Sequence, residues 1–167
     1  MTDHADDRAG SPPDVYPDPA DLLPYGHPAL HVDRILAHRP GALTAVKAVS
    51  GHELGGHAGS ARPARLPSTL VLESFLQACG LLVALDAGDG EPGRLLVFGS
   101  ARNLRFEGAV RAGELLVHEV ERGDTDGDTT VFSGVSRTGD GQLVLTVERA
   151  ITLSRPADSL AAASSGE

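Results

Sequence analysis

The sequence predicts an α+β fold in which an antiparallel sheet curves around one long helix. The first observation is a run over residues 67–86 that is apolar on nearly every face, as expected of a helix enclosed by protein. The second is the chain after Gly88, where four strand patterns are separated by short turns rich in Gly and Asp. A single enclosed helix followed by such a meander is typical of an α+β domain.

Composition limits the classes of protein to which the chain can belong. Its 167 residues, 41% of them hydrophobic, suffice for one domain with its own core. The single cysteine, Cys79, excludes a disulfide framework and indicates a reducing compartment, and we expect it to be a small buried hydrophobe. A net charge of −9 argues against a nucleic-acid-binding protein. Without a targeting signal at its start, the chain is expected to be cytoplasmic.

We expect one folded unit over residues 21–155, flanked by two flexible tails. Residues 1–20 are acidic and rich in proline, and residues 156–167 are small and polar. Neither segment has the apolar content that offsets the entropy of ordering a chain. No internal repeat or linker divides the unit between them.

The first half of the folded unit is expected to run from a short leading segment through a strand and a loop into the helix. Residues 43–49 have a strand pattern, and residues 51–67 contain four glycines and two prolines, which predicts a loop. This loop is longer than usual connections, so we expect it to line a site. Pro67 is suited to open the helix. The stretch 70–85, interrupted by polar residues, is expected to be too short to span a bilayer.

The second half is expected to be all strand. The predicted strands cover residues 95–98, 115–121, 129–136 and 142–153, and turn signals at 123–127 and 139–141 join the last three.

One carboxylate, Glu73, lies inside the apolar helix and is the first candidate for chemistry. Burial costs an ionised carboxylate several kcal/mol and raises its pKa, so that it becomes a proton donor near neutral pH. Such a group is suited to general acid catalysis. The alternative is a structural glutamate that hydrogen-bonds to Gln77, one turn later. The helix by itself leaves both interpretations open.

Four motifs in series resemble those of the β-hydroxyacyl-acyl carrier protein dehydratases. Residues 22–34, LLPYGHPALHVDR, are similar to the family's opening L-P-H-R-Y-P-x-L-x-V-D-R. Pro40-Gly41, followed by Val46-Lys47, is similar to its next strand. Residues 66–77, LPSTLVLESFLQ, resemble its helix pattern M-P-G-x-L-x-x-E-x-x-x-Q, and residues 105–114 resemble R-F-x-x-x-V-x-x-G-D. The resemblance extends over residues 20–153 in one order, which makes it specific although each motif alone is weak.

The resemblance implies a hotdog fold whose active sites lie at a dimer interface. Each site would take a histidine from one protomer and the helix carboxylate, here Glu73, from the other. The implied substrate is a 3-hydroxyacyl thioester on an acyl carrier protein, which loses water to give a 2,3-unsaturated thioester. No metal or redox cofactor is implied. A zinc site at His52 and His57 is not expected, because no further ligands have fitting spacing.

The chain departs from the family in the loop that should carry the base. The family pattern G-H-F-P-x-x-P-x-M-P-G places its histidine two residues closer to the helix than His57, and an ungapped count puts Gly59 at that position. In one interpretation the pliable loop still delivers His57, giving an active dehydratase. In the other the chain is a non-catalytic or half-catalytic partner of another hotdog subunit. His52 is a possible substitute base, although a surface residue is the simpler interpretation.

Three further residues of the same helix are expected at the substrate. Ser68 and Thr69 begin the helix, where backbone N–H groups and the helix dipole stabilise a thioester oxygen that gains charge. Ser68 replaces the family's glycine, and its hydroxyl is also suited to cap the helix. Gln77 lies one turn beyond Glu73, and the match to the helix motif implies that it binds substrate.

The remaining polar residues have simpler expected roles. His118 alternates with apolar neighbours and is expected to face solvent, and His31 is expected at a strand rim. Asp33 and Arg34 are expected to form an ion pair or a turn-fixing contact.

We expect Arg62 and Arg65 to form a docking patch for an acyl carrier protein. Because both this protein and the carrier protein are acidic, binding needs a local patch of positive charge. Arg94, Arg102 and Arg105 would extend the patch, and scattered solvating charges are the alternative. A different function class also stays open, a hotdog acyl-thioesterase, whose helix carboxylate activates water.

Overall fold

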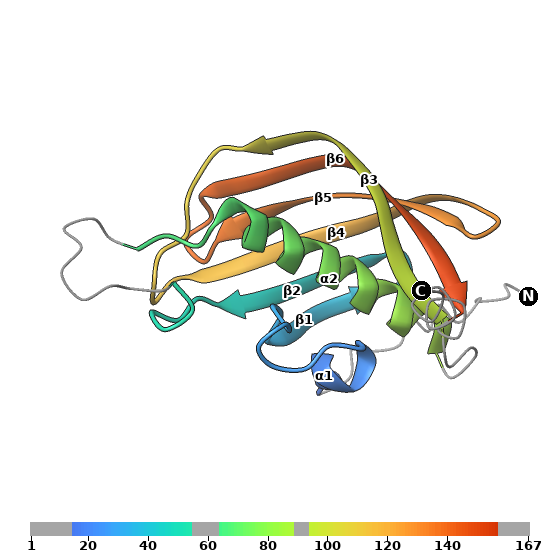
Figure 1. Ribbon diagram of the computed structural model, residues 1–167, viewed down its shortest axis with the longest axis horizontal. Coiled ribbons are helices and arrows are strands. Elements are labelled where there is room, and N and C mark those ends of the chain that lie inside the picture. The colour runs from blue at the N-terminus through green and yellow to red at the C-terminus, as the bar shows by residue number, and fades with distance from the viewer. Residues whose placement is uncertain (1–14, 55–63, 89–93, 157–167) are drawn as a thin grey trace, which may run out of the picture.

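The computed structural model describes residues 15–54, 64–88 and 94–156. They form a curved sheet with a long helix packed against it (Figure 1). The helices are α1 (Pro19–Leu22) and α2 (Ser68–Ala87), and the strands are β1 (Arg34–Arg39), β2 (Ala42–Ala48), β3 (Arg94–Phe106), β4 (Leu115–Asp126), β5 (Thr129–Thr138) and β6 (Leu143–Pro156). The long apolar helix and the meander after it are as the sequence predicts.

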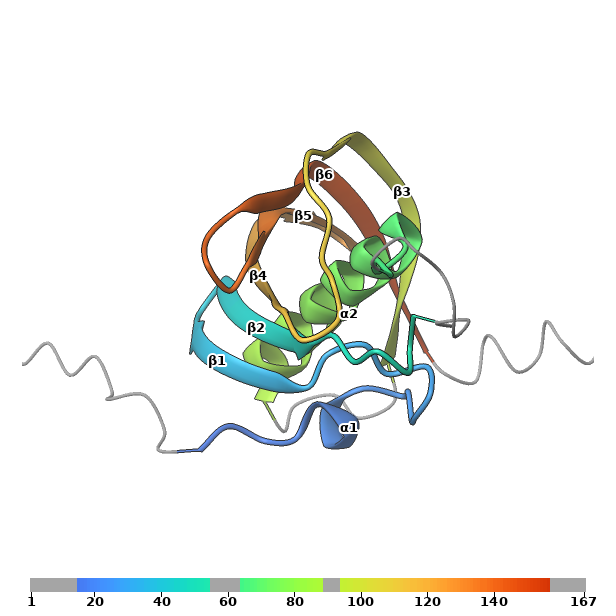
Figure 2. The same ribbon diagram turned by 90° about the vertical axis from the view of Figure 1, so that its left-hand side faces the viewer.

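The six strands form one antiparallel sheet in the order β1-β2-β4-β5-β6-β3. Seen along the helix, the sheet curls around α2 so that strands flank it on several sides (Figure 2). This arrangement confirms the predicted hotdog fold, a long helix wrapped by a bent sheet. Because the sheet bends, residues of β2, β4 and β5 all face the same helix.

The core forms where α2 meets the inner face of the sheet. Five apolar side chains of the helix are at most 2% exposed: Val71, Phe75, Ala78, Leu81 and Leu82. Cys79 is also fully buried, as predicted, and burial raises the pKa of its thiol well above the ordinary range.

By length and composition α2 qualifies as a helix able to cross a membrane, so the expectation that this segment is too short is wrong. The contacts of its buried residues with the sheet are those of a core helix.

Phe75 packs against a point where β5 has no side chain. A Cβ atom added to Gly134 would lie 3.0 Å from Cε2 of Phe75 and 2.1 Å from the backbone oxygen of Glu119. Glycine at this position therefore lets the helix and the neighbouring strand approach β5 more closely than any other residue would allow.

The end of α2 is fixed by one buried carboxylate. Asp86 is 2.9 Å from Nε2 of His38 and 2.9 Å from a guanidinium nitrogen of Arg122, and it accepts a hydrogen bond from the Gly41 amide. These partners lie on β1, on β4 and in the β1–β2 turn. A carboxylate at a helix C-terminus is unfavourable for the helix dipole, and these three partners offset that cost.

Two elements before residue 42 have no counterpart among the predicted strands and helices. Edge strand β1 follows the leading motif, and most of its residues are exposed, so it lacks the apolar alternation on which the prediction depends. Helix α1 begins at Pro19 with Asp18 as its N-cap. Before it, the Tyr16 hydroxyl accepts a hydrogen bond from the His38 amide at 3.0 Å. The rest of the two predicted tails, residues 1–14 and 157–167, lies outside the described residues.

Candidate active site around Glu73

Glu73 lies in the second turn of α2 and is partly buried. Its Oε1 accepts a hydrogen bond of 2.9 Å from Nε2 of Gln77. The pKa of the nearby Tyr25 hydroxyl is raised, first by burial and second by the negative charge of Glu73. The candidate acid is therefore in a sheltered position beside the leading motif, and the predicted local contact with Gln77 is confirmed.

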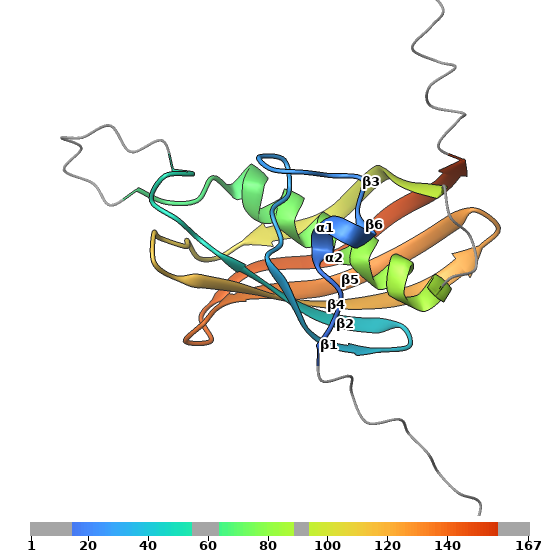
Figure 3. The ribbon, with the colours of Figure 1, turned by 90° about the horizontal axis from the view of Figure 1, so that it is seen from below.

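Gln77 joins Glu73 to the leading segment of the chain. Its Nε2 donates to the Ala29 oxygen at 2.8 Å as well as to Glu73, and its Oε1 accepts from the His31 amide at 2.7 Å. Figure 3 shows this leading segment crossing α2 before it enters β1. Since both amide hydrogens of Gln77 are engaged inside the protein, the side chain has no free donor for a substrate. Its geometry is that of a residue that positions Glu73.

The start of α2 presents free backbone donors close to Glu73. Pro67 is the N-cap residue and contributes no side-chain cap, so the predicted capping by the Ser68 hydroxyl is wrong. The amides of Ser68 and Thr69 are in the first turn, where no helical carbonyl lies one turn earlier to accept their hydrogens. Within the described segments neither amide has a hydrogen-bond partner. Both residues are exposed. This end of the helix is therefore chemically suited to hold an oxygen that gains negative charge.

The loop that leads toward His57 is tethered by a buried lysine. Lys47, on β2, is 1% exposed, and its Nζ lies 2.6 Å from Oε1 of Glu53. The pKa of Glu53 is lowered because hydrogen bonds from Lys47 and Ser50, with the lysine charge, outweigh the largest single effect, which is burial. The tether fixes the first part of the predicted loop. His57 and Arg62 lie outside the described residues.

His118 is buried, so the prediction that it faces solvent is wrong. On β4 it faces α2 together with Leu116 and Val120, whereas Glu119 and Glu121 point to the other side. The two glutamates were the signal for the correct orientation, because alternation places His118 on the opposite face from them. Its Nε2 lies 2.7 Å from Oγ of Ser74, and its Nδ1 lies 2.7 Å from Oγ of Ser136.

Comparison with known proteins establishes the family. The chain is 38% identical over 140 residues to the 3-hydroxyacyl-acyl-carrier-protein dehydratase FabZ of Yersinia enterocolitica, covering 82% of each chain. It is also 38% identical to the protein of that name from Yersinia pestis, covering 82% of this chain and 78% of the other. The chain belongs to the FabZ dehydratase family. No protein-family model matches it.

Solved structures agree with this family on the fold. The dehydratase heterocomplex ApeI:P from Xenorhabdus doucetiae superposes with a TM-score of 0.74 at 18% identity, covering 87% of this chain and 96% of that one. A hypothetical thioesterase from Streptococcus pneumoniae, solved with coenzyme A, gives a TM-score of 0.58 at 15% identity, covering 74% and 85% of the two chains. At such identities the structural similarity shows only that dehydratases and thioesterases share the fold. It gives no information on the activity of this chain.

Three other residues to which the sequence assigns a role lie in the described part of the chain. His31 is partly buried, and its Nδ1 atom is inaccessible and has no hydrogen-bond partner in the described part of the chain. Asp33 accepts a hydrogen bond from the Ala48 amide at 2.6 Å, which links the start of β1 to the end of β2 and is not the predicted pairing with Arg34. Arg65 is exposed and its backbone forms an isolated bridge with Arg111.

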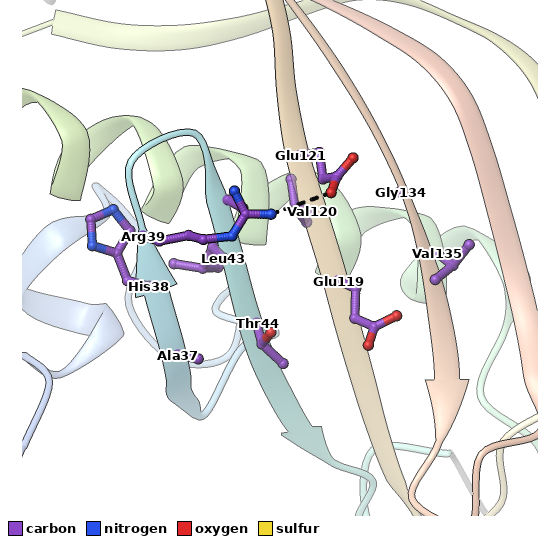
Figure 4. Close-up of a pocket in the computed structure, with 11 residues that line it drawn as sticks. Ala37, His38, Arg39, Leu43, Thr44, Glu119, Val120, Glu121, Gly134 and Val135 are labelled. Atoms are coloured by element: carbon purple, nitrogen blue, oxygen red, sulfur yellow. Dashed lines mark ion pairs between the residues drawn. The ribbon is translucent and has the colours of Figure 1, made fainter. Parts of the chain in front are cut away.

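One pocket of this FabZ-family chain lies away from Glu73. Its lining comes from β1, β2, β4 and β5, and no residue of α2 contributes (Figure 4). Arg39 and Glu121 form an exposed ion pair of 3.6 Å across it. No group of three or more potential metal ligands occurs within residues 15–54, 64–88 and 94–156.

Proposed function

We propose that this protein removes water from a 3-hydroxyacyl thioester carried on an acyl carrier protein, giving the 2,3-unsaturated thioester. The observation that carries the proposal is the sheltered carboxyl of Glu73, held by Gln77 beside the free amides at the start of α2, in a chain of the FabZ family. Fatty-acid or polyketide biosynthesis in the cytoplasm is the setting that we propose.

The reaction needs three functions, and each has a candidate. A base takes the proton from C2, and the electrons of that C–H bond form the C2–C3 double bond as the C3–O bond breaks. Glu73, in its protonated form, gives its proton to the departing hydroxyl, which leaves as water. The amides of Ser68 and Thr69 stabilise the thioester oxygen while charge accumulates there. These steps use no metal or redox cofactor.

His57 is our proposed base. Neutral imidazole is suited to accept a proton at pH 7. The described part of its loop ends at Leu54, just after the ion pair between Lys47 and Glu53. We further propose that the base and Glu73 come from different protomers of a dimer, which is the arrangement that the family resemblance implies.

A second candidate function rests on the position of Gly59. The ungapped alignment places this glycine, which has no side-chain base, where the family has its histidine. A chain of that kind would supply Glu73 to a heterodimer whose other hotdog subunit supplies the base. The two functions differ in whether the purified chain is active alone.

Product mass decides among the candidates. The chain alone is incubated with 3-hydroxyacyl thioesters on a carrier protein, and the molecular masses of the products are measured. Loss of water supports the dehydratase, and release of the free acid would instead indicate a thioesterase. If neither occurs, activity that appears only on mixing with a second hotdog subunit establishes the heterodimer.

Carrier-protein docking is a separate proposal for Arg62 and Arg65. Arg65 is exposed and, within the described segments, has no ion-pair partner, whereas Arg105 is 2.7 Å from Glu148 and Arg111 is paired with Glu114. Reversing Arg62 and Arg65 to glutamate should slow the reaction of carrier-bound substrate and spare a short pantetheine thioester. Equal losses on the two substrates would remove the docking role.

A further inference from the structure

Three polar side chains meet inside the apolar core between α2 and the sheet. Ser74, His118 and Ser136 come from α2, β4 and β5, and each is fully buried. Burying a polar group without a hydrogen bond destabilises a folded protein. The hydrogen bonds of this cluster must therefore be complete for it to be tolerated, and they prove to be directional.

The hydrogens of the cluster can be assigned by counting donors. The His31 carbonyl can only accept, so the Ser74 hydroxyl donates its one hydrogen to it, over 2.5 Å. Oγ of Ser74 then accepts from Nε2–H of His118, and Nδ1 of His118 accepts from the Ser136 hydroxyl. This assignment requires a neutral imidazole. Burial, with a smaller effect from the Lys47 charge, lowers the pKa of His118 to about 3, which keeps it neutral.

The same hydrogen bonds continue to the candidate acid. The Ser74 hydroxyl donates to the His31 oxygen. The Gln77 side chain accepts from the His31 amide and donates to the Ala29 oxygen. Gln77 uses its remaining donor on Glu73, which is the one hydrogen bond of that carboxyl in the described chain. The chain of contacts thus runs from β5 and β4 through α2 and the leading segment to Glu73.

We propose that His118 is a positioning residue for Glu73, acting through Ser74, the backbone of residues 29–31 and Gln77. The proposal rests on the role of Glu73 as the acid. An apolar residue at 118 would fill the core equally well, but it would not orient the Ser74 hydroxyl. The leading segment could then shift along α2 and carry Gln77 with it. Misplacement of a catalytic group by about 1 Å can cost roughly 100-fold in rate.

The experiment compares single variants with a fully apolar replacement. Ser74→Ala and His118→Leu each leave buried groups unsatisfied, and both should lower the unfolding temperature and kcat. The triple variant Ser74→Ala/His118→Leu/Ser136→Ala leaves only the His31 oxygen without its partner, so it should regain most of the stability. We expect its kcat to stay about tenfold below that of the natural sequence, with KM within about twofold. Thr152→Val removes a buried hydroxyl bonded to Thr130 and serves as a control for core damage without loss of kcat.

Amide hydrogen exchange gives a readout that does not depend on activity. The His31 amide should exchange faster in Ser74→Ala and in the triple variant, and at an unchanged rate in Thr152→Val. If exchange at His31 does not change, or if kcat recovers together with stability in the triple variant, the positioning role is overturned. If the natural sequence performs no dehydration and the His31 amide still loses protection, the proposed function fails while the structural link to Glu73 stands.

Discussion

Gln77 donates a 2.9 Å hydrogen bond from Nε2 to Oε1 of Glu73, one turn earlier on α2. Because its other polar contacts are with backbone atoms of Ala29 and His31, its own orientation is fixed. Gln77 therefore ties the candidate acid to the leading segment, which it contacts at His31, 46 residues earlier in the sequence. Holding a reactive group in one orientation is a principal means of lowering a reaction barrier.

Replacing Glu73 with glutamine should abolish dehydration and leave the fold intact. The amide keeps an oxygen for the bond from Gln77, but it cannot protonate a departing hydroxyl, so kcat should fall by about 10²–10⁴. The measurement is the steady-state rate of 2,3-unsaturated thioester formation, with the unfolding temperature followed in parallel. Glu121→Gln, at a side chain that is 67% exposed, is the matched control. Retained activity in Glu73→Gln would exclude this residue as the acid.

Variants of the histidines should identify the base. His57→Ala should lower kcat by about 10²–10⁴ in a homodimer that uses this imidazole, and His52→Ala should have little effect. Each is assayed alone and after mixing with Glu73→Gln. Because the proposed sites combine residues of two protomers, a mixed dimer of His57→Ala and Glu73→Gln contains one intact site. Recovery of activity on mixing supports shared sites, and absence of recovery contradicts them.

The stability of the protein should depend on pH through His118. Its pKa is about 3 in the folded chain and has an ordinary value of 6.5 when unfolded. Between these values the unfolded chain binds a proton that the folded chain does not. The stability that comes from the neutral His118 is therefore fully present above pH 6.5 and is lost as the pH falls toward 3. The free energy of unfolding should drop by about 1.4 kcal/mol per pH unit in that range.

Urea unfolding at several pH values tests this dependence against His118→Leu. The other titrating groups are common to both proteins, so the difference between their unfolding free energies isolates His118. That difference should narrow by about 1.4 kcal/mol per unit below pH 6.5. A constant difference between pH 7 and pH 4 would mean that His118 titrates alike in the folded and unfolded chains.

Gly134→Ala should destabilise the fold by about 3 kcal/mol. The new Cβ would lie 2.1 Å from the Glu119 oxygen, and a backbone atom of a paired strand cannot move away at small cost. Gly123→Ala, on neighbouring strand β4, is the control, since its Cβ would meet Val131 at an ordinary 3.6 Å. Chemical denaturation should show a large loss for the first variant and a change of about 0.5 kcal/mol or less for the second. Equal losses would refute the close approach of Phe75 and β4 to β5.

The sequence by itself determined the α+β class, the long helix, the later strands and the choice of Glu73 as the candidate acid. Each of these depends on local pattern: an apolar run, period-two alternation, or turn residues between them. The family motifs added the hotdog arrangement before any coordinates. Edge strand β1 is absent from the prediction because its apolar and polar residues do not alternate.

Only the tertiary structure decided which polar residues are buried and what they contact. His118 and Lys47 have unremarkable places in their strands, yet both lie in the core because the bent sheet turns those faces toward α2. Likewise Gln77, which matches a substrate-binding position by motif, is committed to Ala29, His31 and Glu73. The physical reason is that burial and hydrogen-bond partners are set by residues distant in sequence, and local periodicity carries no information on which of them will meet.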